Sequence, residues 1–134
     1  MAELIFTDMV KERGLSDRFQ ISSFGTSGEE EGNPIYPPAK RMLTMHGISG
    51  SHTARKISPK DIGENDYLLV MDEQNFRNLL RVAGEQNAHK IYKLCAFTET
   101  PRDIADPWYT RDFERAFLDI SDGCRCFLDY VTRN

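Results

Sequence analysis

The residues best suited to catalysis are Asp106-Pro107-Trp108-Tyr109, in a long segment without a clear helix or strand pattern. A residue before proline is restricted to extended conformations, which fixes the direction of the Asp106 side chain. A carboxylic acid beside two aromatic rings can protonate an aromatic leaving group, so Asp106 is a candidate general acid. The same residues also fit a turn in which Asp106 bonds a nearby backbone N–H, and residue chemistry alone favours that turn.

A nucleophile for phosphate chemistry is harder to find in this sequence. A cysteine-based phosphate loop needs a Cys, five residues and then an Arg, placed between a strand and a helix start. Cys95 is followed by Arg102, one residue too far, with Pro101 between them. We therefore interpret Cys95, Cys124 and Cys126 as reduced structural thiols. Their spacing matches no zinc pattern, and no metal or other cofactor is predicted.

Helices are predicted from apolar residues at helical spacing and from residues that favour helix starts. They cover residues 2–13, 37–46, a short stretch from Pro59, the stretch after Asp72, and 113 to the C-terminus. In the helix after Asp72, Val82 is expected to point inward. The last helix has the most continuous apolar face, so we place it in the core.

Three strands are predicted between these helices, at 19–22, 67–71 and 90–95. The second is apolar on both faces, which is typical of a central parallel strand covered by helices. Strands that alternate with helices indicate an α/β fold with a parallel sheet. Three strands are few for such a sheet, and no Ser, Thr, Asp or Asn precedes the first helix to cap it. Both features predict that a strand is missing ahead of this helix.

Size and charge limit the kinds of function available to the chain. With 134 residues, of which 40% are hydrophobic, it is expected to form a single domain over residues 1–134. The formal net charge of −4 argues against binding to nucleic acid or to an anionic membrane. No apolar run reaches the roughly 20 residues needed to span a bilayer, and no signal-peptide pattern is present. A cytoplasmic protein is expected.

Short motifs occur in a fixed order along residues 1–134. They are Met1-Ala2-Glu3, Ser22-Ser23-Phe24-Gly25-Thr26-Ser27-Gly28, Gly32-Asn33-Pro34, His46-Gly47-Ile48, Ser51-His52-Thr53-Ala54-Arg55, Asp66-Tyr67, Met71-Asp72-Glu73-Gln74-Asn75 and Asp106-Pro107-Trp108-Tyr109. Each motif alone is weak evidence. Together, and in this order, they resemble the low-molecular-weight protein tyrosine phosphatase family.

The resemblance implies an α/β fold, a parallel-sheet three-layer sandwich of the phosphotyrosine protein phosphatase I type, here lacking its first strand. It also implies hydrolysis of phosphotyrosine proteins or small aryl phosphates through a phosphocysteine intermediate, without a cofactor. The roles implied by position are general acid for Asp106, a wall beside the substrate ring for Trp108 and Tyr109, and support of the phosphate loop for Ser23 and His52, with Asp72 close by. For His52, an imidazole without that role remains an alternative.

The family signature, V-C-x-G-N-x-C-R-S-P, would stand directly before Met1. The nucleophilic cysteine and the phosphate-binding arginine are therefore absent from these 134 residues, and the chain is expected to be inactive in this form. A truncation of a longer enzyme at Met1 is the favoured explanation. If the 134 residues fold by themselves, a slot is expected where the missing strand would lie, filled by dimerisation, by strand exchange or by disordered edges.

Two other functions remain open, and one position departs from the family pattern. The chain could be a non-catalytic phosphatase-like binding module. It could also be an arsenate reductase relative, which would need resolving cysteines on a mobile loop, whereas Cys124 and Cys126 are predicted on a helix. Glu29 stands where the family usually has an aromatic residue, and the acidic run from Glu29 to Glu31 is interpreted as a solvated loop.

Overall fold

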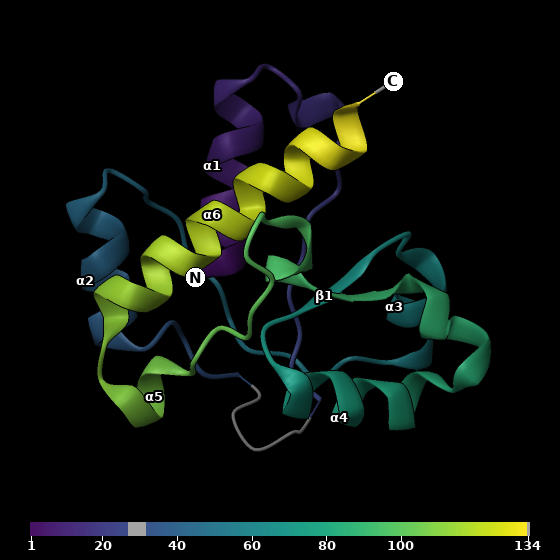
Figure 1. The fold of residues 1–134 in the computed structure, drawn as a ribbon. Helices are drawn as coiled ribbons and strands as arrows, with labels where there is room; N and C mark the ends of the chain where they lie inside the picture. Colours follow the sequence, from purple (N-terminus) through teal and green to yellow (C-terminus); the bar gives the residue numbers. More distant parts are fainter. Residues whose placement is uncertain (27–31, 134) are drawn as a thin grey trace.

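The computed structural model describes residues 1–26 and 32–133. Figure 1 shows a long C-terminal helix that crosses the molecule and packs beside the N-terminal helix. The α-helices and strands are α1 (Ala2–Glu12), α2 (Pro37–Met45), α3 (Pro59–Glu64), β1 (Leu68–Val70), α4 (Glu73–Ala83), β2 (Ile91–Lys93), α5 (Pro107–Thr110) and α6 (Phe113–Thr132). Three 3₁₀ helices are η1 (Ser16–Arg18), η2 (Glu85–Lys90) and η3 (Leu94–Phe97).

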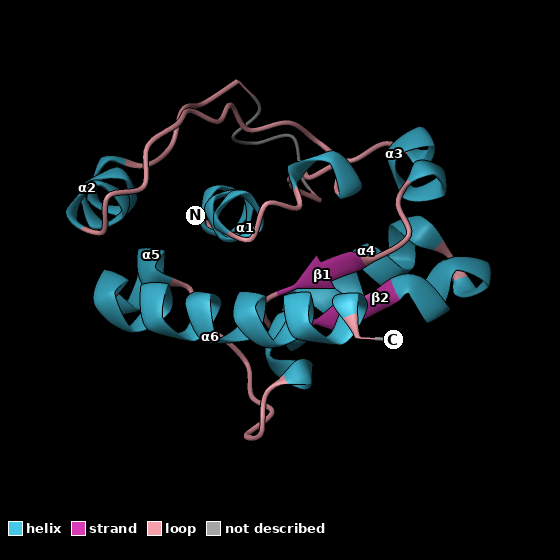
Figure 2. Ribbon diagram, turned by 90° about the horizontal axis from the view of Figure 1, so that it is seen from above, coloured by secondary structure: helices cyan, strands magenta, loops and turns pink. Residues whose placement is uncertain are grey.

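The sheet in the described residues consists of two short parallel strands. β1 pairs with β2 in a register that places Leu68 opposite Ile91 and Val70 opposite Lys93. Figure 2 shows the two strands side by side among the helices. The parallel α/β arrangement predicted from the sequence is confirmed.

The prediction of a strand at residues 19–22 is wrong. Phe19 has extended backbone angles, φ −130° and ψ 141°, but residues 20–24 form no backbone hydrogen bond to another described residue. An extended segment becomes a strand only when a neighbour pairs with its N–H and C=O groups. Here a hollow separates the segment from β1, so no such neighbour is present.

Helices cover both faces of the sheet, which gives the three-layer arrangement. Because side chains alternate along a strand, Leu69 packs towards one core while Leu68 and Val70 belong to the other. The first core is built mainly from α1, α2 and α6, and its fully buried members include Ile5, Val10, Leu43, Leu94, Cys95, Ile104 and Leu128. The second core joins β1 and β2 to α3 and α4.

The helix starts follow the local rules that predicted them, whereas one position inside a helix does not. Ser58 and Asp61 form a capping box at α3, and Asp72 accepts a hydrogen bond from Asn75 N–H at the start of α4. α1 has no side-chain cap, as its sequence indicates. In α4 the inward position predicted for Val82 is wrong, because Val82 is exposed and Ala83 is buried in its place.

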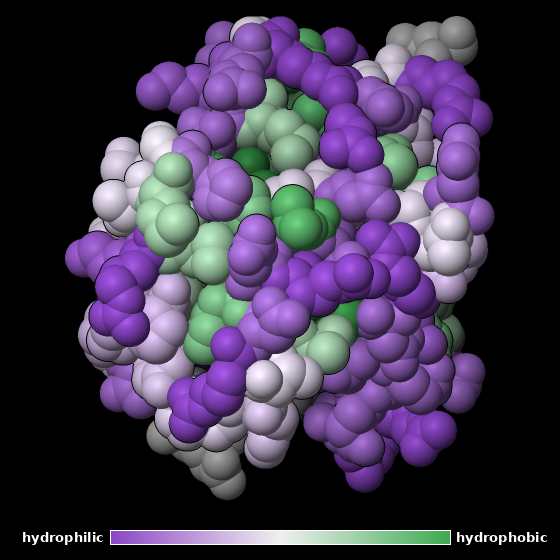
Figure 3. All heavy atoms as spheres, turned by 60° about the vertical axis from the view of Figure 1, so that its left-hand side comes forward, coloured by the Kyte–Doolittle hydropathy of each residue, from purple (hydrophilic) through white to green (hydrophobic). Residues whose placement is uncertain are grey.

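No helix within residues 1–26 and 32–133 is long and apolar enough to cross a membrane. On the face shown in Figure 3, hydrophilic residues predominate and hydrophobic residues lie in patches between them. Among the described large hydrophobic residues, Tyr109 on α5 is the most exposed, at 82%. A ring so poorly packed in the protein is available for contact with another molecule.

The close approach of α6 to η3 predicts the effect of a glycine substitution. A Cβ on Gly123 would lie 2.6 Å from Leu94 Cγ, and Leu94 is almost fully buried. We expect Gly123→Ala to lower the free energy of unfolding by about 1–3 kcal/mol through overpacking. Urea denaturation measures this change. The matched control is Gly63→Ala in α3, where nothing lies within 4 Å of the added Cβ, so unchanged or slightly higher stability is expected. Equal effects at both positions would contradict the packing argument.

Candidate active site

Asp106 lies at the N-terminus of α5 with one carboxylate oxygen engaged. Its Oδ1 accepts a hydrogen bond of 2.9 Å from Trp108 N–H, while Oδ2 bonds no other described residue. The side chain is exposed to solvent. The turn that residue chemistry favoured is therefore present, and it leaves the second oxygen free to carry a proton. Capping and acid catalysis are compatible in this geometry.

The aromatic side chains of α5 differ in how they are held. Trp108 meets Tyr36, which precedes α2, edge to face with ring centroids 4.8 Å apart, whereas Tyr109 points into solvent. Trp108 itself is 47% exposed, so part of its surface remains open next to Asp106. Tyr36 was not predicted as a site residue, because nothing in its own stretch of sequence indicates a contact with residues 72 positions away.

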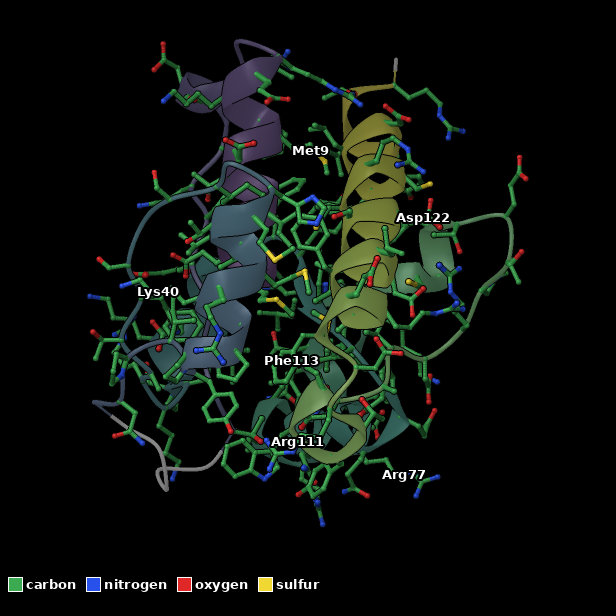
Figure 4. All side chains as sticks on the ribbon, turned by 90° about the vertical axis from the view of Figure 1, so that its left-hand side faces the viewer. Met9, Lys40, Arg77, Arg111, Phe113 and Asp122 are labelled. Carbon is green, nitrogen blue, oxygen red and sulfur yellow. The ribbon has the colours of Figure 1, made fainter. Side chains whose placement is uncertain are left out.

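Arg111 contacts both Tyr36 and Trp108. Its Nη1 donates a hydrogen bond of 2.9 Å to the Tyr36 hydroxyl, and its guanidinium lies 5.4 Å from the centre of the Trp108 ring. Its backbone is left-handed, with φ 61°, where the chain turns from α5 into α6. In Figure 4, Arg111 lies below Phe113, at the end of the molecule where α6 begins. Arg111 was not predicted as a site residue either.

Ser23 and His52, whose predicted support of a phosphate loop stays a prediction, lie close together, and a third residue joins them. The Ser23 hydroxyl donates a 2.7 Å hydrogen bond to Glu3 Oε1 and lies 3.3 Å from His52 Nε2. His52 Nδ1 is 3.4 Å from the same Glu3 oxygen. Glu3 belongs to the first turn of α1, so this cluster connects the helix start to two loops. A negatively charged side chain such as Glu3 in the first turn also interacts favourably with the dipole of α1.

Asp72 is not part of that cluster in the structure. Its Oδ1 accepts a hydrogen bond from Asn75 N–H at 2.8 Å, and Asn75 in turn accepts one from Met71 N–H. Asp72 therefore fixes the junction between β1 and α4. No hydrogen bond or ion pair among the described residues joins Asp72 to Ser23 or His52. The predicted role of Asp72 beside them stays a prediction.

The three cysteines do not form a reactive site. Cys95 is fully buried and its Sγ lies 3.4 Å from the Asp119 carbonyl oxygen, while burial raises its pKa. Burial also raises the pKa of Cys124 to about 12. Both thiols are thus held in the unreactive protonated form at neutral pH. Cys124 and Cys126 lie on α6, which disfavours a pair of resolving cysteines on a mobile loop.

The acidic run Glu29 to Glu31 lies outside the described residues. The described parts of the site come from α1, from loops 19–26 and 46–58, and from α5. In Figure 1 the start of α4, α5 and the end of the segment 19–24 all lie at the lower side of the molecule. This is the side to which the carboxyl end of β1 leads, the usual place for ligand sites in open parallel sheets.

Comparison with known proteins identifies the family. The family model described as low molecular weight phosphotyrosine protein phosphatase matches residues 1–134. The chain belongs to this family. The protein YfkJ of Bacillus subtilis, named as a low molecular weight protein-tyrosine-phosphatase, is 34% identical over 136 residues, covering 99% of this chain and 87% of YfkJ. The human low molecular weight phosphotyrosine protein phosphatase is also 34% identical, covering 96% of this chain and 85% of the human protein.

Solved structures of this phosphatase family share the fold. The crystal structure of YfkJ matches with a TM-score of 0.93 at 32% identity, over 98% of this chain and 85% of YfkJ. The crystal structure of the Drosophila arginine phosphatase DARP matches with a TM-score of 0.91 at 27% identity, over 99% of this chain and 89% of DARP. The family and fold implied by the ordered motifs are therefore confirmed.

The Arg111 contacts predict a change in the environment of Trp108, the single tryptophan of the chain. We expect Arg111→Gly, which suits the left-handed backbone, to release Trp108 from Tyr36 and increase its exposure. The measurement is tryptophan emission with acrylamide quenching, expected to show a red shift and stronger quenching. Arg133→Ala is the control, because Arg133 stacks on Tyr130. Unchanged quenching in Arg111→Gly would show that Arg111 does not hold the ring.

The cysteine environments predict an order of alkylation. With iodoacetamide at pH 8, the partly exposed Cys126 should react first, and Cys95 and Cys124 only when the protein unfolds. Peptide mass spectrometry identifies the modified residue.

The raised pKa of Cys124 also sets a pH dependence. Above pH 9 the unfolded state loses this proton while the folded state keeps it to about pH 12, so stability should fall as pH rises in this window. Cys124→Ala should show a smaller fall. A native protein in which Cys124 reacts as fast as Cys126 would contradict its buried, protonated state.

Proposed function

We propose that this chain supplies the general acid and the substrate-ring wall of a protein tyrosine phosphatase that acts on phosphotyrosine proteins or small aryl phosphates. Asp106 would protonate the oxygen that leaves with the aromatic ring, and Trp108 and Tyr109 would contact that ring. A cytoplasmic site of action belongs to the same proposal. The observation that carries it is the exposed Asp106 carboxylate, whose Oδ1 accepts the Trp108 N–H while Oδ2 bonds no other described residue, two positions before the half-exposed Trp108.

The second part of the proposal concerns the nucleophile. None of Cys95, Cys124 and Cys126 is followed after five residues by an arginine, and the two most buried thiols have raised pKa values. We therefore propose that the 134 residues alone do not turn over phosphate esters. The cluster of Glu3, Ser23 and His52 would support a phosphate loop placed against the start of α1.

The first test is an assay of the 134-residue chain on p-nitrophenyl phosphate and on phenyl phosphate. No turnover above buffer is expected. Turnover by this chain would overturn the inactivity proposal. A non-catalytic binding module, the second candidate, predicts that the chain stays inactive even when a phosphate loop is supplied.

The second test supplies that loop. A strand followed by the family signature V-C-x-G-N-x-C-R-S-P can be fused directly ahead of Met1. We expect the fusion to hydrolyse both substrates. In the fusion, Asp106→Asn should reduce kcat by about 10²- to 10⁴-fold on phenyl phosphate. The loss should be smaller on p-nitrophenyl phosphate, whose phenolate leaves more easily without a proton.

The control for this substitution is Asp112→Asn, which changes the capping residue of α6 six positions away. Asn can cap a helix as Asp does, so folding should be preserved in both variants. The steady-state kinetics of each variant across pH 4–9 measure the effect. Equal losses in the two variants, or an equal loss on both substrates, would contradict the general-acid role of Asp106.

A further inference from the structure

Arg111 is held in place by aromatic side chains and not by a carboxylate. Its Nη1 donates to the Tyr36 hydroxyl at 2.9 Å, and its guanidinium lies 5.4 Å from the centre of the Trp108 ring. No Asp or Glu within residues 1–26 and 32–133 forms an ion pair with it. Arg115, four positions later, pairs with Asp119. In the described part of the chain, Arg111 is therefore a fixed positive charge without an opposite charge beside it.

The two carboxylates nearest to Arg111 in the sequence cap helices. Asp112 Oδ1 accepts a hydrogen bond of 2.9 Å from Arg115 N–H at the start of α6. Asp106 Oδ1 accepts one of 2.9 Å from Trp108 N–H at the start of α5. Neither residue forms an ion pair with Arg111, so the local sequence does not neutralise this guanidinium.

The guanidinium of Arg111 keeps one edge available for hydrogen bonds. An arginine carries five N–H donors in a planar fork. Nη1 is used by Tyr36, whereas Nε and Nη2 donate to no other described residue. The edge formed by Nε and Nη2 matches the two oxygens of a carboxylate, which it binds through two parallel hydrogen bonds. Arg111 is therefore suited to recognise a carboxylate while it stays bonded to Tyr36.

Tyr36, which holds Arg111, is itself held from two sides. Its ring centre lies 4.8 Å from that of Trp108 and 5.9 Å from that of Phe113, the first residue of α6. In Figure 4, Arg111 and Phe113 lie at the same end of the molecule, where α6 begins. The orientation of the guanidinium is thus set by α6 through Phe113 and Tyr36. A group oriented in this way loses little conformational freedom when it binds a ligand.

We infer that Arg111 is a specificity-determining residue that binds an Asp or Glu side chain of the peptide substrate, within two residues of the substrate tyrosine. This inference rests on the proposed function, because it takes Trp108 as the wall beside the tyrosine ring. The guanidinium lies 5.4 Å from the centre of the Trp108 ring. Each residue of an extended peptide spans about 3.5 Å, so a residue one or two positions from the tyrosine reaches Arg111.

The phosphate of the substrate fits the available edge of Arg111 less well than a carboxylate does. A phosphate monoester presents three oxygens and close to two negative charges. One edge of one guanidinium pairs with two oxygens and balances one charge. A carboxylate has two oxygens and one charge, so it matches this edge in both respects.

The first test measures binding to the 134-residue chain, so it does not depend on turnover. The probes are acetyl-Glu-Glu-Tyr-Glu-Glu-amide and its neutral counterpart with Gln in place of each Glu. Emission of Trp108, the single tryptophan, reports binding beside Arg111, and calorimetry gives a second value that does not depend on this ring. The acidic peptide should bind at least about fivefold more tightly than the neutral one. Equal affinities, or no saturable binding of the acidic peptide up to about 10 mM, would overturn the inference.

Variants of the protein separate the charge of Arg111 from its orientation. Arg111→Gln should reduce the preference for the acidic peptide to about one, because the charge is lost. Arg111→Lys keeps the charge without the fork, and Tyr36→Phe removes only the hydroxyl that orients the fork, so both should show intermediate preferences. The matched control is Arg133→Gln, since Arg133 also stacks on a ring, 5.8 Å from the centre of Tyr130.

Arg133 lies next to the C-terminus, which Figure 1 places far from α5, so Arg133→Gln should keep the full preference for the acidic peptide. Circular dichroism verifies that all variants are folded. An equal loss in Arg111→Gln and Arg133→Gln would overturn the inference in favour of a general charge effect. A neutral phosphotyrosine peptide that binds through Arg111 more tightly than the acidic peptide would also overturn it, because Arg111 would then recognise the phosphate.

The second test measures specificity in the fused form that carries the phosphate loop. The substrates are the phosphotyrosine versions of the acidic and neutral peptides, and the measured quantity is the ratio of their kcat/KM values. Arg111→Gln should lower this ratio at least about fivefold, whereas Arg133→Gln should leave it unchanged. An active fusion whose ratio does not respond to Arg111→Gln would overturn the inference alone. A fusion without turnover would count against the proposed function, while the binding test on the 134-residue chain would still decide the role of Arg111.

Discussion

The apolar face of α6 is the packing interaction on which the remaining parts of the structure depend. α6 contacts α1, α2, α5 and η3, and Leu128, Cys124 and Ile120 on this face are almost fully buried. Gly123 of α6 has no side chain, so Leu94 of η3 packs closely against it. Because β2 leads directly into η3, this contact also fixes the position of β2 relative to α6. The capping residue of α6, Asp112, directly follows the turn at Arg111, so the position of α6 also fixes α5. The position of Asp106 therefore depends on the packing of α6 against the core.

A second constraint is that backbone N–H and C=O groups need hydrogen-bond partners. Around β1 the packing of the helices does not supply these partners. Helices can satisfy their own backbone, so α1 and α6 form their core contacts without help from the sheet. A strand cannot, and residues 19–24 remain an extended segment beside a hollow. The hydrophobic clusters show the consequence, because Leu69 and Ile21 are only partly buried although both contact the first core. Packing holds the layers in place, while the sheet between them has two strands in the described residues.

The elements that the sequence predicted correctly are those whose cause is local. Caps and apolar spacing placed α3, α4 and α6, since Ser58, Asp72 and the residues after Asp112 act within a few positions of themselves. The strand at 19–22 failed because its state depends on a neighbour far away in the chain. The same reason explains the missed site residues. Tyr36, Arg111 and Glu3 reach their partners across long sequence separations, and no spacing rule carries that information.

The two oxygens of Asp106 explain how one residue can serve both structure and chemistry. Oδ1 caps α5, which holds the carboxyl group in one orientation relative to Trp108. Oδ2 is then the oxygen that can exchange a proton with a bound molecule. Asn in this position keeps the capping oxygen, but its amide NH2 cannot act as an acid at the second atom, so the two roles are separable by a single substitution. Arg111 also contributes, because its hydrogen bond to Tyr36 limits the movement of the Trp108 ring that Tyr36 contacts. The orientation of the Asp106 carboxyl group therefore rests on hydrogen bonds that the chain itself provides.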